Sequence, residues 1–130
     1  INNDDYTGMM TNWWQELIVE NNELSSLIPE IHNIDASVIR KHEYDAFFET
    51  SLEETLKLRG IKNLIVTGVM THLCVETTVR SAFVRGFQPY LPVNGTATYH
   101  EGFHKASLLN LSHGFAIITT MEILIDSLKE

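Results

Sequence analysis

The sequence predicts an α/β fold: a three-layer sandwich with a mainly parallel central sheet and helices on both faces. The first observation is that short apolar runs alternate with helical patterns along the chain. Such alternation favours parallel strands joined by right-handed crossovers. The second is the stretch 61–86, where a strand, a turn and a helix follow one another. The third is length, because 130 residues suit one domain with a single core.

Strands and helices are expected to alternate from residue 37 onward. The expected strands are 37–40, 64–66, 88–93 and 115–119, and the expected helices are 50–59, 74–85, 101–113 and 121–128. Pro89 and Pro92 weaken the third strand and predict that it is irregular or lies toward an edge of the sheet. Before residue 37, we expect a loop at 1–11 and a short helix that carries an apolar stripe of Trp13, Trp14, Leu17 and Ile18.

Composition excludes several classes of protein. The net charge is -8, from 17 acidic and 9 basic residues, which argues against binding to nucleic acid or to an anionic membrane. No apolar run reaches the ~20 residues of a membrane span, and no leader of signal-peptide type is expected. A single cysteine is typical of a reducing compartment, so we expect a cytoplasmic protein.

That cysteine, Cys74, falls in the first turn of the predicted helix, just past the carboxyl end of a strand. Ligands of open α/β sheets bind at this edge. The free N–H groups and partial positive charge of a helix N-terminus favour a thiolate and can stabilise an oxyanion. A buried structural cysteine is the alternative that position alone leaves open. A redox-sensing thiol is a third interpretation, but the chain has no second cysteine to resolve it.

The segment 69–78, VMTHLCVETT, resembles the nucleophile segment of the isochorismatase-like cysteine hydrolases, a superfamily of nicotinamidases, N-carbamoyl amidases and isochorismatases. The segment 38–47, VIRKHEYDAF, resembles the lysine segment of that family, with Asp45 in place of a common serine. The segment 94–98, NGTAT, and the helix 100–113 also fit the pattern. The resemblance covers residues 38–124 and implies an isochorismatase-like, Rossmann-like fold.

The resemblance also implies a catalytic site. Cys74 would be the nucleophile, Lys41 would support its thiolate, and the backbone N–H groups of Met70 and Cys74 would form an oxyanion hole. The peptide bond between Val69 and Met70 would be cis. The candidates for substrate binding are Phe47, Thr71, His72 and Trp13. Phe47 and the tryptophans have a core role as their alternative, and His72 has the alternative of orienting loop backbone.

No metal and no cofactor are expected. The six histidines are scattered, and the Asp-x-His element through which some nicotinamidases of the family bind a metal is not found. The expected partners are a small-molecule substrate and further copies of the chain, in a homo-oligomer that is a dimer or a tetramer.

The family begins with a strand that ends in the aspartate acting as general base, and nothing in this chain resembles it. Asp4 and Asp5 follow no apolar strand. We therefore expect residues 1–130 to form one isochorismatase-like domain that lacks the N-terminal strand and helix. The predicted function is cysteine-dependent hydrolysis of a small amide or related substrate through a covalent acyl-enzyme. The alternative is a non-catalytic subunit or binding module that lacks the general base.

Overall fold

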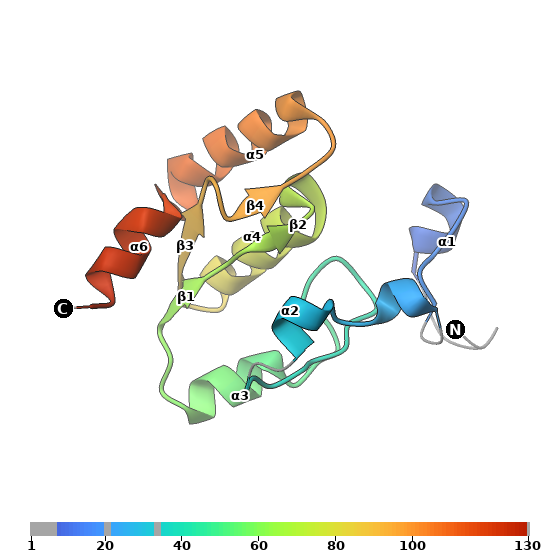
Figure 1. Ribbon diagram of the computed structural model, residues 1–130, viewed down its shortest axis with the longest axis horizontal. Helices are drawn as coiled ribbons and strands as arrows, with labels where there is room; N and C mark the ends of the chain where they lie inside the picture. Colours follow the sequence, from blue (N-terminus) through green and yellow to red (C-terminus); the bar gives the residue numbers. More distant parts are fainter. Residues whose placement is uncertain (1–7, 20–21, 33–34, 130) are drawn as a thin grey trace.

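Two parallel sheets and several helices make up the fold of the computed structural model, which describes residues 8–19, 22–32 and 35–129 (Figure 1). The helical elements are α1 (Met10–Trp13), η1 (Glu23–Ser25), α2 (Pro29–His32), α3 (Leu52–Leu58), η2 (Thr71–Val75), α4 (Glu76–Val84), α5 (Glu101–Gly114) and α6 (Met121–Ser127). The strands are β1 (Asn63–Ile65), β2 (Gly68–Val69), β3 (Gln88–Pro92), β4 (Thr96–Ala97) and β5 (Ile117–Thr119).

The main sheet has three strands in the order β1-β3-β5, and both pairs are parallel. A second, two-stranded sheet pairs β2 with β4, also in parallel. The α/β class with a parallel sheet, predicted from the alternation of elements, is therefore confirmed. None of the helices in the described part of the chain is long and apolar enough to cross a membrane.

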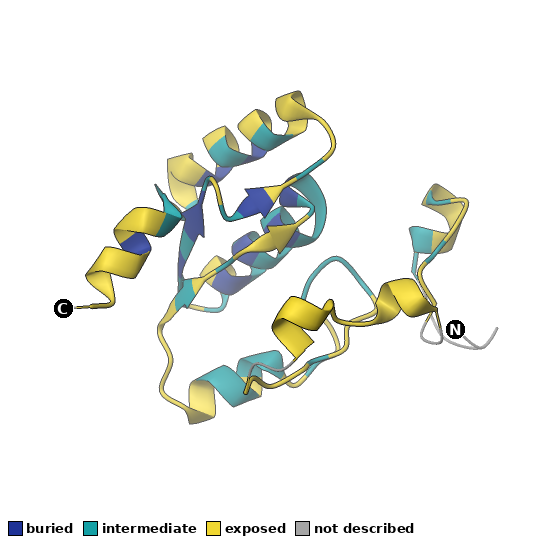
Figure 2. Ribbon diagram, in the orientation of Figure 1, coloured by how far each residue is buried: buried dark blue, intermediate teal, exposed yellow. Residues whose placement is uncertain are grey.

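The core lies between the main sheet and the helices α4 and α5. Val79 of α4, Leu91 of β3 and Leu111 of α5 are fully buried and belong to one cluster. A second cluster joins Phe47 to Ala82 of α4 and to Phe87. Figure 2 shows buried residues on β3 and β4 and on the helices α4 and α5. Burial of this apolar surface holds α4, the helix that follows Cys74, against the sheet.

The prediction that the proline-containing strand is irregular or lies toward an edge was wrong, because β3 is a regular strand in the middle of its sheet. Backbone N–H groups point alternately to the two neighbouring strands. Gln88 donates to Lys62 on the β1 side, and Val93 donates to Thr119 on the β5 side. By this alternation the backbone nitrogen of Pro89 points toward the β5 side, at a level just before the first residue of β5. The backbone nitrogen of Pro92 points toward the β1 side, at a level past the last residue of β1. Each proline therefore sits where its missing N–H has no ladder partner.

The predicted strand at 37–40 is not found, and residues 35–41 have no regular secondary structure. Among the described residues, β1 pairs with β3 and no strand covers its other edge. A strand needs a neighbouring backbone to bond with, so this segment stays irregular. Figure 1 shows α1 and α2 apart from the main sheet. The predicted N-terminal helix is shorter than its apolar stripe and ends at Trp13, while residues 1–7 of the predicted loop lie outside the described residues.

Candidate active site

Cys74 lies on η2, a turn of π-helix between β2 and α4. The turn is closed by the Val75 N–H, which donates to the Met70 carbonyl at 3.3 Å. The peptide bond between Val69 and Met70, directly before this turn, is cis. Cys74 is a half-buried free thiol. Single π-helical turns are rare in proteins, and those that occur are often found at functional sites. The location of the cysteine therefore favours a chemical role over a packing role.

Lys41 is brought to the cysteine from 33 residues earlier in the chain. Its Nζ lies 3.5 Å from the Sγ of Cys74 and also donates to the Glu43 carbonyl at 2.8 Å. Lys41 reaches this position from an irregular segment instead of a strand end. Among the described residues, no carboxylate or imidazole forms a hydrogen bond with this sulfur.

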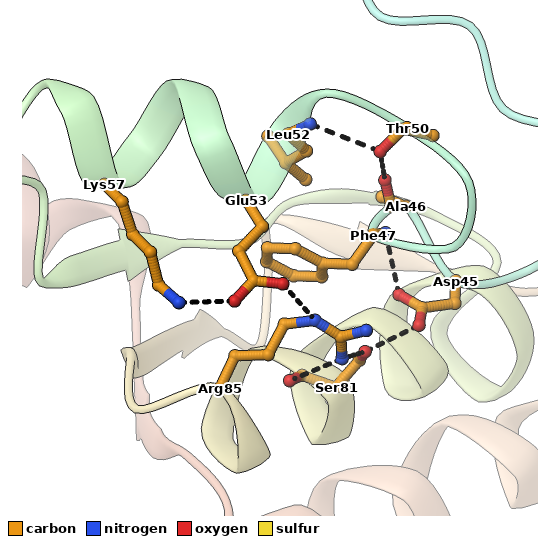
Figure 3. A network of polar contacts seen from close by, with 9 residues as sticks. All are labelled: Asp45, Ala46, Phe47, Thr50, Leu52, Glu53, Lys57, Ser81 and Arg85. Carbon is orange, nitrogen blue, oxygen red and sulfur yellow. Dashed lines mark hydrogen bonds and ion pairs between the residues drawn. The ribbon is translucent and has the colours of Figure 1, made fainter.

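The chain after Lys41 is fixed to α3 and α4 by a network of polar contacts (Figure 3). Asp45 accepts from the Phe47 N–H at 2.9 Å and from the Ser81 hydroxyl at 2.6 Å. Arg85 donates to Ser81 and forms an ion pair of 2.9 Å with Glu53 of α3. Asp45 of the lysine segment thus binds α4 directly. This network holds the lysine segment beside the helix that follows the cysteine.

Two of the candidates for substrate binding, Phe47 and Trp13, differ sharply in burial. Phe47 is 5% exposed, and its ring stacks on Phe87 at 5.8 Å and lies under the Arg85 guanidinium. It is therefore a core residue in this structure. Trp13 is 76% exposed on α1. The neighbouring Trp14 is half-buried, and its Nε1 donates to the Tyr44 hydroxyl at 2.6 Å, so this tryptophan contacts the lysine segment.

The other two candidates, Thr71 and His72, lie on the cysteine turn itself. Thr71 is fully buried, and its hydroxyl forms a hydrogen bond of 3.0 Å with Nδ1 of His104 on α5. His72 pairs with the Thr98 hydroxyl at 3.0 Å and stacks on the Phe103 ring at 4.5 Å. Both side chains are held by protein groups, and His72, which is half-buried, retains some access to solvent.

A hollow of about 320 Å³ lies one helical turn from the cysteine, at Thr77. Its other lining residues include Tyr44 and Asp45 of the lysine segment and Met9 near the N-terminus. Cys74 does not line it. No three histidine, cysteine, aspartate or glutamate side chains of the described residues are grouped so as to hold a metal ion.

Sequence reasoning missed the polar residues that hold the cysteine turn. Glu76 accepts from Ser107 of α5 at 2.5 Å and from Arg80 at 2.8 Å. The i, i+4 spacing of Glu76 and Arg80 is a usable signal for their ion pair. The contacts of His104 and Ser107 have no such signal, because they join residues more than 30 positions apart.

Comparisons with known proteins show which family this parallel α/β fold belongs to. Residues 4–123 match the model of the isochorismatase domain. The chain is 39% identical over 125 residues to nicotinamidase 3 of Arabidopsis thaliana, covering 93% of this chain and 63% of that protein. It is 34% identical over 96 residues to a ureidoacrylate amidohydrolase of Acinetobacter baylyi, covering 71% of this chain and 38% of that protein.

A solved structure supports the same assignment. The crystal structure of an isochorismatase-like hydrolase from Alkaliphilus metalliredigens superposes with a TM-score of 0.80 and is 30% identical, covering 85% of this chain and 62% of that one. The chain belongs to the isochorismatase family. It spans less than two thirds of the length of each of these three relatives.

Proposed function

We propose that this protein is a cysteine-dependent hydrolase of small amides. The observation that carries the proposal is the 3.5 Å contact between Lys41 and Cys74, on a π-helical turn at the start of a helix. The proposal is supported by the names of two relatives, a nicotinamidase and a ureidoacrylate amidohydrolase, both of which indicate cleavage of a C–N bond. A small substrate with an amide or carbamoyl group is the class common to both names.

In the proposed reaction, the thiolate of Cys74 attacks the carbonyl carbon of the substrate. A C–S bond forms, the C–N bond breaks, and the proton lost by the thiol ends on the departing nitrogen. The product of this half-reaction is a thioester on Cys74 and a free amine or ammonia. Water then attacks the thioester, which releases the acid and restores the thiol. No oxidant or reductant is needed.

Lys41 and the backbone of the turn would stabilise charge along this path. The ammonium group of Lys41 lies beside the sulfur and so opposes the cost of forming a thiolate. The backbone N–H groups of Met70 and Cys74 are the proposed donors to the oxyanion that forms in the first step. Donors fixed on a backbone need no rearrangement as the charge develops, which makes this kind of stabilisation effective.

The proposal is tested by incubating the protein with nicotinamide and with ureidoacrylate and measuring the release of ammonia. Acid quenching followed by intact-mass analysis looks for the acyl group on the protein, and peptide mapping then assigns it. We expect hydrolysis of at least one of these amides and an acyl mass on the peptide that contains Cys74. An acyl mass on another residue, or equal hydrolysis by a Cys74→Ala variant, would overturn the proposal.

A non-catalytic subunit or binding module is the second candidate. One observation favours it: within the described residues, the sulfur has a cation as neighbour but no hydrogen-bonded group that could accept its proton. The rate of alkylation by iodoacetamide separates the two candidates. Rapid labelling near pH 6 supports the enzyme, whereas labelling that rises only above about pH 8 together with no hydrolysis supports the binding module.

A further inference from the structure

Helix α5 is bonded to both ends of the turn that carries Cys74. At the first residue of the turn, the Thr71 hydroxyl meets Nδ1 of His104 at 3.0 Å. Just past the last residue, the carboxylate of Glu76 accepts from the Ser107 hydroxyl at 2.5 Å. His104 and Ser107 are three residues apart, so they lie on the same side of α5. One face of this helix therefore contacts the turn on either side of the cysteine.

These contacts are buried, which makes them persistent. Thr71 is 0% exposed and Ser107 is 2% exposed. Water cannot replace a lost partner at such positions without a rearrangement of the packing around them, so the native bonds are retained. Neither Thr71 nor Ser107 has a step in the proposed mechanism, and neither is hydrogen-bonded to the sulfur.

Glu76 is held from two directions. One carboxylate oxygen accepts from Ser107, and the other accepts from Arg80 at 3.1 and 2.8 Å. The guanidinium of Arg80 in turn lies 4.3 Å from the centre of the Phe115 ring, directly after α5. The start of α4 is thus fixed to α5 by the carboxylate of Glu76, whose side chain is 18% exposed.

We propose that His104 and Ser107 are positioning residues, which set the location of the Cys74 sulfur by fixing both ends of its turn to α5. This inference rests on the proposed function, because it assigns these residues a part in that reaction. The sulfur must stay within reach of Lys41, and its distance from the ammonium group is 3.5 Å. A turn released at one end would let the sulfur move away from the ammonium group.

The test compares two variants on α5 with a matched control on the same helix. Ser107→Ala removes the hydroxyl with little change in volume, and His104→Leu removes the ring nitrogen. Ser112→Ala is the control, because Ser112 is exposed and donates to the Leu109 carbonyl on the same helix. We expect kcat to fall on the order of 10- to 100-fold in the first two, with KM little changed, since a displaced reacting group costs rate more than binding.

Alkylation of Cys74 by iodoacetamide gives a second readout that needs no turnover. We expect the labelling curve, the time course of alkylation at a fixed pH, to change in Ser107→Ala and in His104→Leu and to stay as in the unmodified protein in Ser112→Ala. His104→Asn keeps a polar nitrogen or oxygen near the position of Nδ1 and should restore the curve. Circular dichroism confirms that each variant is folded before labelling.

The outcomes separate failure of this inference from failure of the proposed function. If the unmodified protein hydrolyses no amide but the labelling curve changes as expected, the positioning role stands and the proposed reaction fails. Folded Ser107→Ala and His104→Leu proteins with the labelling curve and kcat of the unmodified protein would overturn the positioning role. If Ser107→Ala does not fold, His104→Leu and His104→Asn decide the question alone.

Discussion

Lys41 and Cys74 show what a local sequence pattern can and cannot predict about single residues. Both were identified from segments that resemble family motifs, and the structure brings them to 3.5 Å. The role of each in catalysis stays a prediction. Phe47 was a candidate for substrate binding with a core role as its alternative. It is buried in the core, and a part in substrate binding stays a prediction. His104 and Ser107 were missed because their hydrogen bonds join residues more than 30 positions apart, and no local sequence pattern around either partner indicates such a bond.

At this scale, replacing Lys41 by methionine should make Cys74 less reactive. The ammonium group lies 3.5 Å from the sulfur, so its removal should slow the labelling curve, the time course of reaction with iodoacetamide at a fixed pH. The matched control is Lys105→Met, because Lys105 forms an exposed ion pair with Glu101 on α5. Identical curves for Lys41→Met and the unmodified protein would mean that Lys41 does not act on the sulfur.

Elements with strong apolar periodicity were predicted best. Four such elements lie within a few residues of their predicted places: the strand β1 and the helices α4, α5 and α6. The errors concern pairing: the segment 37–40 finds no partner strand, and β3 lies in the middle of its sheet despite its prolines. The pairing of a strand depends on where its neighbouring strands start and stop, and those neighbours are distant from it in the sequence. The small sheet of β2 and β4 was not predicted for the same reason, because its two strands are also distant in the sequence.

Helix α5 offers a test of the core. Leu111 is 0% exposed and packs between α4 and β3, whereas Leu109 on the same helix is 72% exposed. Leu111→Ala should lower the free energy of unfolding by about 2–5 kcal/mol, because it removes buried methyl groups and leaves a cavity. Leu109→Ala should change it by less than about 0.5 kcal/mol. Urea unfolding curves measure both, and similar losses in the two variants would contradict the assigned core.

For the whole molecule, the lowered pKa values of three glutamates predict how the free energy of unfolding depends on pH. Hydrogen bonds from Lys57 and then Arg85 hold the pKa of Glu53 below its ordinary value of 4.5, and a bond from Lys105 does the same for Glu101. The backbone N–H of Glu122 is the main cause of the lowered pKa of that residue. In the unfolded chain these groups take up protons first as pH falls, so acid favours unfolding.

The stabilising effect of these carboxylates should be complete above about pH 4.5 and should disappear as pH falls through their lower folded values. Glu53→Gln should therefore flatten the loss of stability below about pH 4.5. Glu54→Gln, next to it on α3, removes an equal charge without breaking the ion pairs of Glu53. Urea unfolding at neutral and acid pH compares them, and an unchanged acid slope in Glu53→Gln would refute this account.

The homo-oligomer that the family resemblance implies also stays a prediction for the whole molecule. Ile65 of β1 and Ile117 of β5 alternate with residues that face α4 and α5, yet they are 45% and 46% exposed. Exposed apolar surface of this kind is common at protein interfaces. Sedimentation velocity should give a species of two or four times 14.8 kDa, and a single species at 14.8 kDa would contradict the prediction.

The measurement that tests the central claim most directly is amide hydrolysis as a function of alkylation at Cys74. Because the chain has one cysteine, intact mass gives the fraction alkylated at that residue. If Cys74 is the nucleophile, hydrolysis should fall in proportion to alkylation and reach zero when the thiol is fully blocked, and substrate should slow the alkylation. Undiminished hydrolysis by fully alkylated protein would show that the reaction does not pass through this sulfur.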